Sequence, residues 1–77
     1  MADFEVYIDD DRYSVPTLYL ITATGEQGAR AKAQEVLDAS DHHQGVELRQ
    51  DGERIFVLGS FALLGRSAHD RQDAPTL

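Results

Sequence analysis

Two short runs of residues in this chain have side chains that could bind a metal ion. They are the aspartates Asp9, Asp10 and Asp11 and the histidines His42 and His43. Carboxylate oxygens suit Mg²⁺, Ca²⁺ or Mn²⁺, and imidazole nitrogens suit Zn²⁺ or Ni²⁺. The spacing matches neither the calcium loop of an EF-hand nor the H-E-x-x-H motif of zinc enzymes. The sequence therefore favours a solvated acidic turn, and the alternative is a metal site with four ligands, Asp9, Asp11, His42 and His43.

The two histidines also have an explanation that needs no ligand. They follow a predicted helix and lie close in sequence to Asp38 and Asp41. A protonated imidazole in that position meets the negative end of the helix dipole and the nearby carboxylates. We interpret His42 and His43 in this way, and we expect the protein to hold no cofactor.

The sequence offers little for catalysis or for phosphate binding. Serine, histidine and aspartate are all present, but no G-x-S-x-G nucleophile elbow occurs. Residues 23–28 join a strand to a helix N-terminus, where backbone N–H groups can hold a phosphate. They lack the glycine spacing of the known phosphate loops, and Glu26 would place a negative charge beside the anion. We expect a simple helix start here and no enzymatic activity.

Apolar periodicity and turn residues define the elements that position these side chains. Alternation predicts a half-buried strand over residues 4–9. Residues 17–23 are apolar on both faces and predict the central strand of the sheet. A helix is expected over residues 24–40 with Thr24 as its N-cap, followed by two strands joined by an Asp-Gly turn at 51–52. The predicted fold class is α+β, ββαββ, with a mixed or antiparallel four-stranded sheet and one helix packed on one face.

The Asp-Gly turn also predicts which side chains of the last two strands face the helix. A two-residue turn pairs Leu48 with Ile55 and places both on the helix side. Phe56 and Leu58 then point to the opposite face, together with part of residues 18–21. Because one helix covers only one face of a sheet, we expect an exposed apolar patch there, which is typical of an interface.

The chain is expected to form one domain over residues 1–65, in which residues 61–64 are the alternative cover for the apolar patch. Residues 66–77 are polar and show no periodicity, which predicts a flexible tail. There is no cysteine, and hence no disulfide and no thiolate zinc site. We find no signal-peptide pattern and no apolar run long enough for a membrane, so a cytoplasmic location is expected.

Charge restricts the choice of partner. The formal net charge is −7, and the acidic residues are concentrated before residue 54. Such a surface repels a phosphate backbone or an anionic membrane, so we expect no direct contact with nucleic acid or membrane. A protein partner with a basic surface is the favoured interpretation.

These observations predict a small acidic, non-enzymatic protein-interaction module that docks on a basic, nucleic-acid-binding surface of a protein partner. Aspartates would steer the encounter, and apolar anchors would supply affinity. In size, charge and topology the chain resembles several uncharacterised bacterial domains and some phage-encoded inhibitors of bacterial defence, and the second resemblance implies an inhibitor or modulator. The alternatives are a metal- or ligand-binding bacterial protein and a purely homo-oligomeric structural protein, and we expect at least a homodimer. The residues assigned to partner binding are Asp9, Asp10, Asp11, Tyr19, Phe56 and Leu58.

Overall fold

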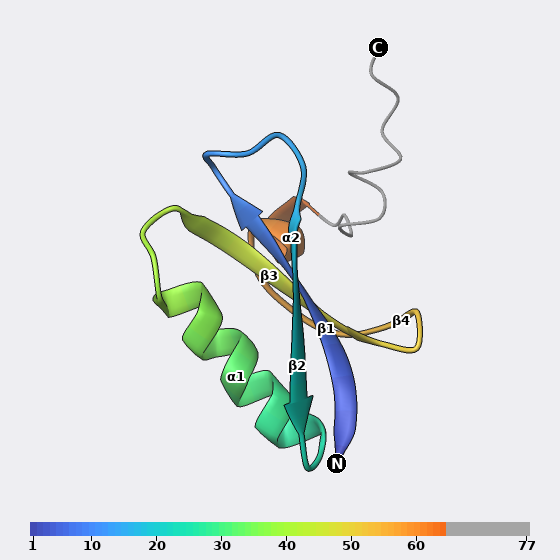
Figure 1. Ribbon diagram of the computed structural model, residues 1–77. Coiled ribbons are helices and arrows are strands. Elements are labelled where there is room, and N and C mark those ends of the chain that lie inside the picture. Colours follow the sequence, from blue (N-terminus) through green and yellow to red (C-terminus); the bar gives the residue numbers. More distant parts are fainter. Residues whose placement is uncertain (65–77) are drawn as a thin grey trace.

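The computed structural model describes residues 1–64, so the predicted tail over residues 66–77 lies outside the described residues. The elements in chain order are β1 (Ala2–Asp10), β2 (Thr17–Ala23), α1 (Glu26–Asp38), β3 (His43–Gln50), β4 (Glu53–Gly59) and α2 (Ser60–Leu64). The four strands form one antiparallel sheet in the order β2-β1-β3-β4, and α1 packs on one face of it (Figure 1). The predicted α+β fold class is confirmed. Neither helix within these 64 residues is long and apolar enough to cross a membrane.

The strand order places β1 and β3 in the middle of the sheet and β2 at an edge. The prediction that residues 17–23 form the central strand is therefore wrong. Leu18, Tyr19 and Leu20 leave 47%, 53% and 73% of their surfaces exposed. An apolar run without alternation is typical of a strand covered on both faces, but here it lies at the margin of the sheet.

The core lies between α1 and the sheet. The helix contributes alanines, and Ala29 and Ala33 are completely buried. Such small side chains let α1 lie close to the strands, although they add little apolar area. The strands supply the larger buried side chains of the same cluster, which are Phe4, Val6, Ile8, Val46 and Leu48.

Helix α1 begins at Glu26 and ends at Asp38, inside the predicted range of residues 24–40. Its N-cap is Gly25 rather than Thr24, and no side chain caps the first turn. The amide of Ala29 donates to the carbonyl oxygen of Gly25 at 3.1 Å, which closes the first turn. Glu26 stands in that turn, where its negative charge is favourable beside the helix dipole, and it pairs with Arg30 at 2.7 Å.

A β-bulge changes the faces of β4. The Asp-Gly turn forms as predicted, but the register shifts between Leu48 and Arg49, so Leu48 lies opposite Phe56 instead of Ile55. A bulge adds one residue to one strand, and every side chain beyond it changes face. Phe56 and Leu58 consequently pack against the core beneath α1, and the prediction that they point to the opposite face is wrong.

The face opposite α1 is partly covered by α2. Gly59 adopts a φ of 69°, in the left-handed region that favours glycine, and the chain turns there from β4 into α2. Phe61 of α2 is buried and packs against Tyr7 of β1. Burial also raises the pKa of the Tyr7 phenol. Phe61 thus covers part of this face, which the sequence offered only as the alternative to an exposed apolar patch.

The same face holds a buried carboxylate. Glu47 of β3 has no exposed surface, and its Oε2 lies 3.2 Å from Nη1 of Arg49 and 3.1 Å from Nε of Arg54. A buried charge is tolerated only when it is paired in this way. This face is therefore a mixed surface of ion pairs and aromatic rings, and it is not the apolar patch that the sequence predicted.

Candidate functional site

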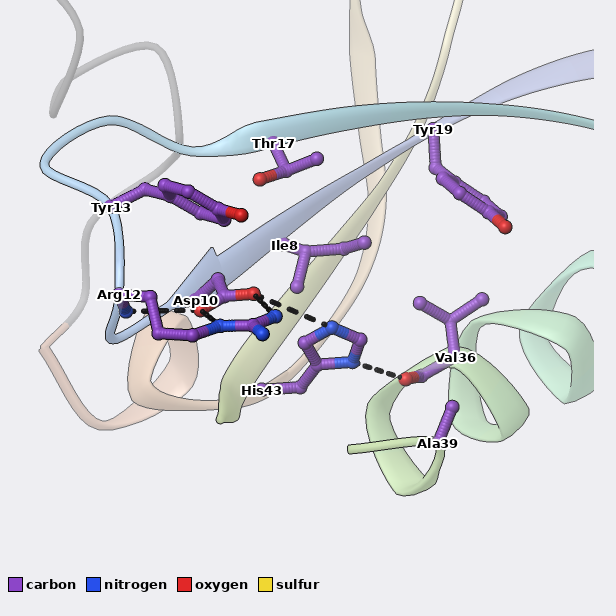
Figure 2. Close-up of a pocket in the computed structure, with 9 residues that line it drawn as sticks. All are labelled: Ile8, Asp10, Arg12, Tyr13, Thr17, Tyr19, Val36, Ala39 and His43. Atoms are coloured by element: carbon purple, nitrogen blue, oxygen red, sulfur yellow. Dashed lines mark hydrogen bonds and ion pairs between the residues drawn. The ribbon is translucent and has the colours of Figure 1, made fainter. Parts of the chain in front are cut away.

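A pocket lies where β1 ends, between the β2 side of the sheet and the C-terminal part of α1 (Figure 2). Its volume is about 350 Å³, near the lower end for small-molecule sites. Ile8 and Val36 form apolar walls from the sheet and the helix, and Tyr13 and Tyr19 lie along the β2 side. The pocket is thus mostly apolar, with one polar end.

The polar end is built on a tightly held ion pair. Arg12 donates from Nε to Oδ1 of Asp10 at 2.9 Å and from Nη2 to Oδ2 at 2.7 Å, and its amide donates to Oδ1 at 3.0 Å. The side-chain hydrogen bonds from Arg12 are the main reason that the pKa of the buried Asp10 lies well below its usual range. Asp10 in turn raises the pKa of Arg12. Asp10 is therefore a permanent carboxylate near neutral pH and is unsuited to proton transfer.

The sequence predicted one solvated turn for the three consecutive aspartates, and this prediction is wrong. Asp9 and Asp10 belong to β1, where alternation directs them to opposite faces. Asp9 accepts a hydrogen bond of 2.6 Å from the Ser60 hydroxyl, on the side of α2. Asp11 follows the strand and is exposed, 2.8 Å from Nδ1 of His42.

The second histidine is fixed by the end of the helix. Nδ1 of His43 lies 2.6 Å from the carbonyl oxygen of Val36, and it must be the donor because a carbonyl only accepts. Val36 stands in the last turn of α1, and its carbonyl oxygen also accepts the amide of the C-cap residue Ala39 at 3.2 Å. Nε2 of His43 lies 3.7 Å from Oδ2 of Asp10. The contact of His43 with the helix end agrees with the C-terminal interpretation, whereas the carboxylates that contact His43 and His42 are Asp10 and Asp11.

The four candidate metal ligands are not brought together. Asp11 and His42 meet, whereas Asp9 bonds Ser60 and His43 bonds the helix end. In the part of the chain that the structure describes, no three side chains of histidine, cysteine, aspartate or glutamate converge in a way that could hold a metal ion.

A second candidate surface runs along β2 and the loop before it. We call it the β2 strip, and its exposed large apolar residues are Tyr13, Val15, Leu18, Tyr19 and Leu20. No charged residue occurs between Arg12 and Glu26. Natural sheets usually protect an edge with charges, a bulge or a covering element. An exposed apolar patch of this kind is typical of an interface.

The main chain of β2 also presents free hydrogen-bonding groups. The carbonyl of Asp10 accepts from Tyr13 in the β1–β2 loop, whereas the amide of the next residue, Asp11, donates toward His42. The main-chain N–H and C=O groups of even-numbered residues of β1 therefore point toward β2, because these groups alternate in direction along a strand. With Val6 opposite Tyr19, the odd-numbered residues of β2 bond back to β1. The N–H and C=O groups of its even-numbered residues point outward.

The predicted partner-binding residues lie in different environments. Tyr19 is exposed on the β2 strip, and Asp11 is exposed beyond β1. Phe56 and Leu58 are half-buried beneath α1, and the guanidinium of Arg30 lies 5.0 Å from the centroid of the Phe56 ring. The available surface is thus centred on β2 and not on β4.

The sequence did not single out the pocket or the free edge. One signal for the pocket was present, since Asp10 and Arg12 stand two residues apart where a strand ends. For the edge, the signal was the absence of any charge between Arg12 and Glu26. No protein-family model, curated protein sequence or solved structure matches this chain.

Proposed function

We propose that this protein is a non-enzymatic protein-interaction module whose contact surface is the β2 strip. The observation that carries the proposal is the combination of exposed Leu18 and Leu20 side chains with outward main-chain groups on an uncharged edge strand. Adding a strand to such an edge gives affinity through main-chain hydrogen bonds and specificity through alternate side chains.

The acidic surface outside the β2 strip supports the proposal that this protein regulates a basic protein partner. Exposed carboxylates lie on α1 and in the loop after it, for example Glu35, Asp38 and Asp41. Long-range attraction of this kind raises association rates more than it raises final affinity. An acidic module that covers a basic surface excludes nucleic acid from it, which is how an inhibitor or modulator would act.

The chemistry of the pocket supports a non-enzymatic role. Its carboxylate, Asp10, is held by Arg12, and Nδ1 of His43 is held by the carbonyl of Val36. Neither group is placed as a free general base. Small-molecule binding is a second candidate function, because the pocket is mostly apolar and has a few polar groups at one end.

The proposal is tested by affinity capture from a lysate of the source organism, with the wild-type chain and two variants as bait. Leu20→Asp places a charge in the middle of the β2 strip. Ala31→Asp adds the same charge at an exposed position of α1 and is the matched control. We expect Leu20→Asp to lose partner proteins that Ala31→Asp retains. Equal capture by all three baits would contradict the proposal.

A further inference from the structure

The proposed function leaves open which strand lies against β2. Resting on that proposed function, we infer that this strand is β2 of a second copy of the chain. Two sheets would then join about a twofold axis into one antiparallel sheet of eight strands. A twofold contact is self-complementary, as in most homodimers.

The main chain of β2 defines the register of this joint. Its outward groups belong to Leu18, Leu20 and Thr22, as the ladder with β1 requires. Leu20 is the midpoint of the seven residues of β2. With Leu20 opposite its own copy, the two residues exchange a pair of N–H···O=C bonds, and Leu18 lies opposite Thr22 of the second copy. In this register each of the seven residues lies opposite a residue of the second strand, and the carbonyl oxygen of Thr22 would accept both from Lys32 and from the Leu18 amide of the second copy.

The side chains are compatible with the same register. Opposed residues of an antiparallel pair share a face, so Tyr19 lies opposite Ile21 of the second copy on the helix side. On the other side Leu20 meets Leu20 of the second copy. Leu20 is the most exposed large apolar residue of β2, at 73%. The contact therefore covers the apolar surface that the monomer leaves in water.

Electrostatics favour a second copy over a basic partner at this particular edge. The strand has no carboxylate of its own to attract a basic protein, which is drawn to the exposed carboxylates of α1 and the loop after it, and the repulsion between two acidic copies is weak at β2. The nearest carboxylates on the strands are Asp3 and Glu5 of β1. Across the joint the two β1 strands lie three strand spacings apart, about 14 Å. That separation exceeds the screening length of about 8 Å at physiological salt.

The other edge of the sheet is unsuited to the same contact. Strand β4 contains the bulge, and it begins with the charged residues Glu53 and Arg54. Bulges and charges are the usual devices that keep an edge from pairing. At the β2 edge, Lys32 bonds the carbonyl oxygen of Thr22, and the groups of Leu18 and Leu20 stay available.

The absence of cysteine makes the register directly testable by disulfide crosslinking. Directly opposed residues of a hydrogen-bonded pair have Cα atoms about 5.5 Å apart, within the disulfide range of about 4.4–6.8 Å. Leu20→Cys should therefore give a covalent dimer under mild oxidation, and Ala31→Cys should not. Leu18→Cys and Thr22→Cys should each stay uncrosslinked alone and form a mixed disulfide when combined. Failure of Leu20→Cys to crosslink beyond the Ala31→Cys control would overturn the inference.

Light scattering at micromolar concentration gives the independent measurement. The wild-type chain should have twice its chain mass of 8.5 kDa, and Leu20→Asp should have the monomer mass with an unchanged circular dichroism spectrum. A monomeric wild type would overturn the inference. If the wild type is monomeric while Leu20→Asp still abolishes partner capture, the proposed function stands and only the second copy is excluded.

Discussion

The side-chain ammonium of Lys32 lies 2.6 Å from the main-chain carbonyl oxygen of Thr22, which joins the middle of α1 to the outer edge of β2. Lys32→Ala removes this hydrogen bond, and water can replace it because the site is exposed. We expect the free energy of unfolding to fall by less than about 1 kcal/mol, measured by urea denaturation. Arg30→Ala, which removes an exposed ion pair of the same helix, is the control. A loss of several kcal/mol with Lys32→Ala alone would mean that this contact holds the helix to the edge strand.

The pair of Asp10 and Arg12 makes stability depend on pH in a defined direction. The pKa of Asp10 is lower in the folded protein than in the unfolded chain, where it is about 3.9. Its contribution is therefore complete above that value and is lost as pH falls toward the lower folded pKa. Asp10→Asn should unfold at lower urea than wild type at neutral pH, and the difference should shrink near pH 3. Asp51→Asn in the exposed turn is the control, and an equal difference at both pH values would refute the prediction.

The bulge predicts that two apolar residues respond differently to truncation. Phe56 packs against the core beneath α1, so Phe56→Ala should cost about 2 kcal/mol of stability, less than for a fully buried ring. Leu20 is exposed, so Leu20→Ala should stay within about 0.5 kcal/mol after correction for any self-association. Chemical denaturation of both variants at low concentration provides the comparison. Similar losses would argue against the observed register of β4.

Glu47 is expected to be among the most sensitive polar positions. Its buried carboxylate pairs with Arg49 and Arg54, and Glu47→Gln removes the negative charge that the two cations share. Breaking a buried pair in this way costs about 3 kcal/mol or more. Arg54→Gln should cost less, since that side chain is partly exposed and one partner of Glu47 remains. A thermal denaturation series of the two variants decides the order, and a wild-type melting temperature for Glu47→Gln would contradict it.

Added salt should affect binding to a basic partner differently from pairing between two copies of the chain. Neutralising Asp11, Asp38 and Asp41 together to asparagine should slow association with a basic partner and flatten the salt dependence of the rate. These three residues are exposed, unlike Asp9 and Asp10. Added salt should slow the wild type in the same experiment, whereas pairing between two acidic copies should be unchanged or strengthened. Stopped-flow rates and light scattering across a salt series measure both, and a salt-independent on-rate would remove the steering argument.

The sequence predicted the parts of the fold that local chemistry decides. Asp51 and Gly52 adopt φ angles of 52° and 81°, which an Asp-Gly pair tolerates and a two-residue hairpin turn requires. Alternation located β1, and the spacing of Ala29 and Ala33 located the buried stripe of α1. These signals depend on neighbours along the chain, and they predicted the fold class and the first five elements in the correct order, whereas α2 was not predicted.

The errors concern information that the sequence holds only at long range. An apolar run such as Thr17–Ala23 is typical of a covered strand, and its edge position follows only from the strand order, in which β2 pairs with β1 and with no other described strand. No residue type at Ile55 marks the bulge, so Phe56 was assigned to the wrong face. The pocket requires the β1–β2 loop to bring Arg12 back onto Asp10, and its polar end could not be placed beforehand.

The difference between the two edges of the sheet limits how far strands can accumulate. A sheet with two open edges can recruit copies without end, which is the route to filaments and fibrils. Here the bulge at Ile55 interrupts the regular pairing of β3 with β4, at the edge of the sheet opposite β2. A copy that joins at β2 brings a β4 edge of its own, and the bulge together with Glu53 and Arg54 makes that edge a poor site for a further strand. Ile55, the extra residue of the bulge, therefore limits how regularly a further strand could pair along β4.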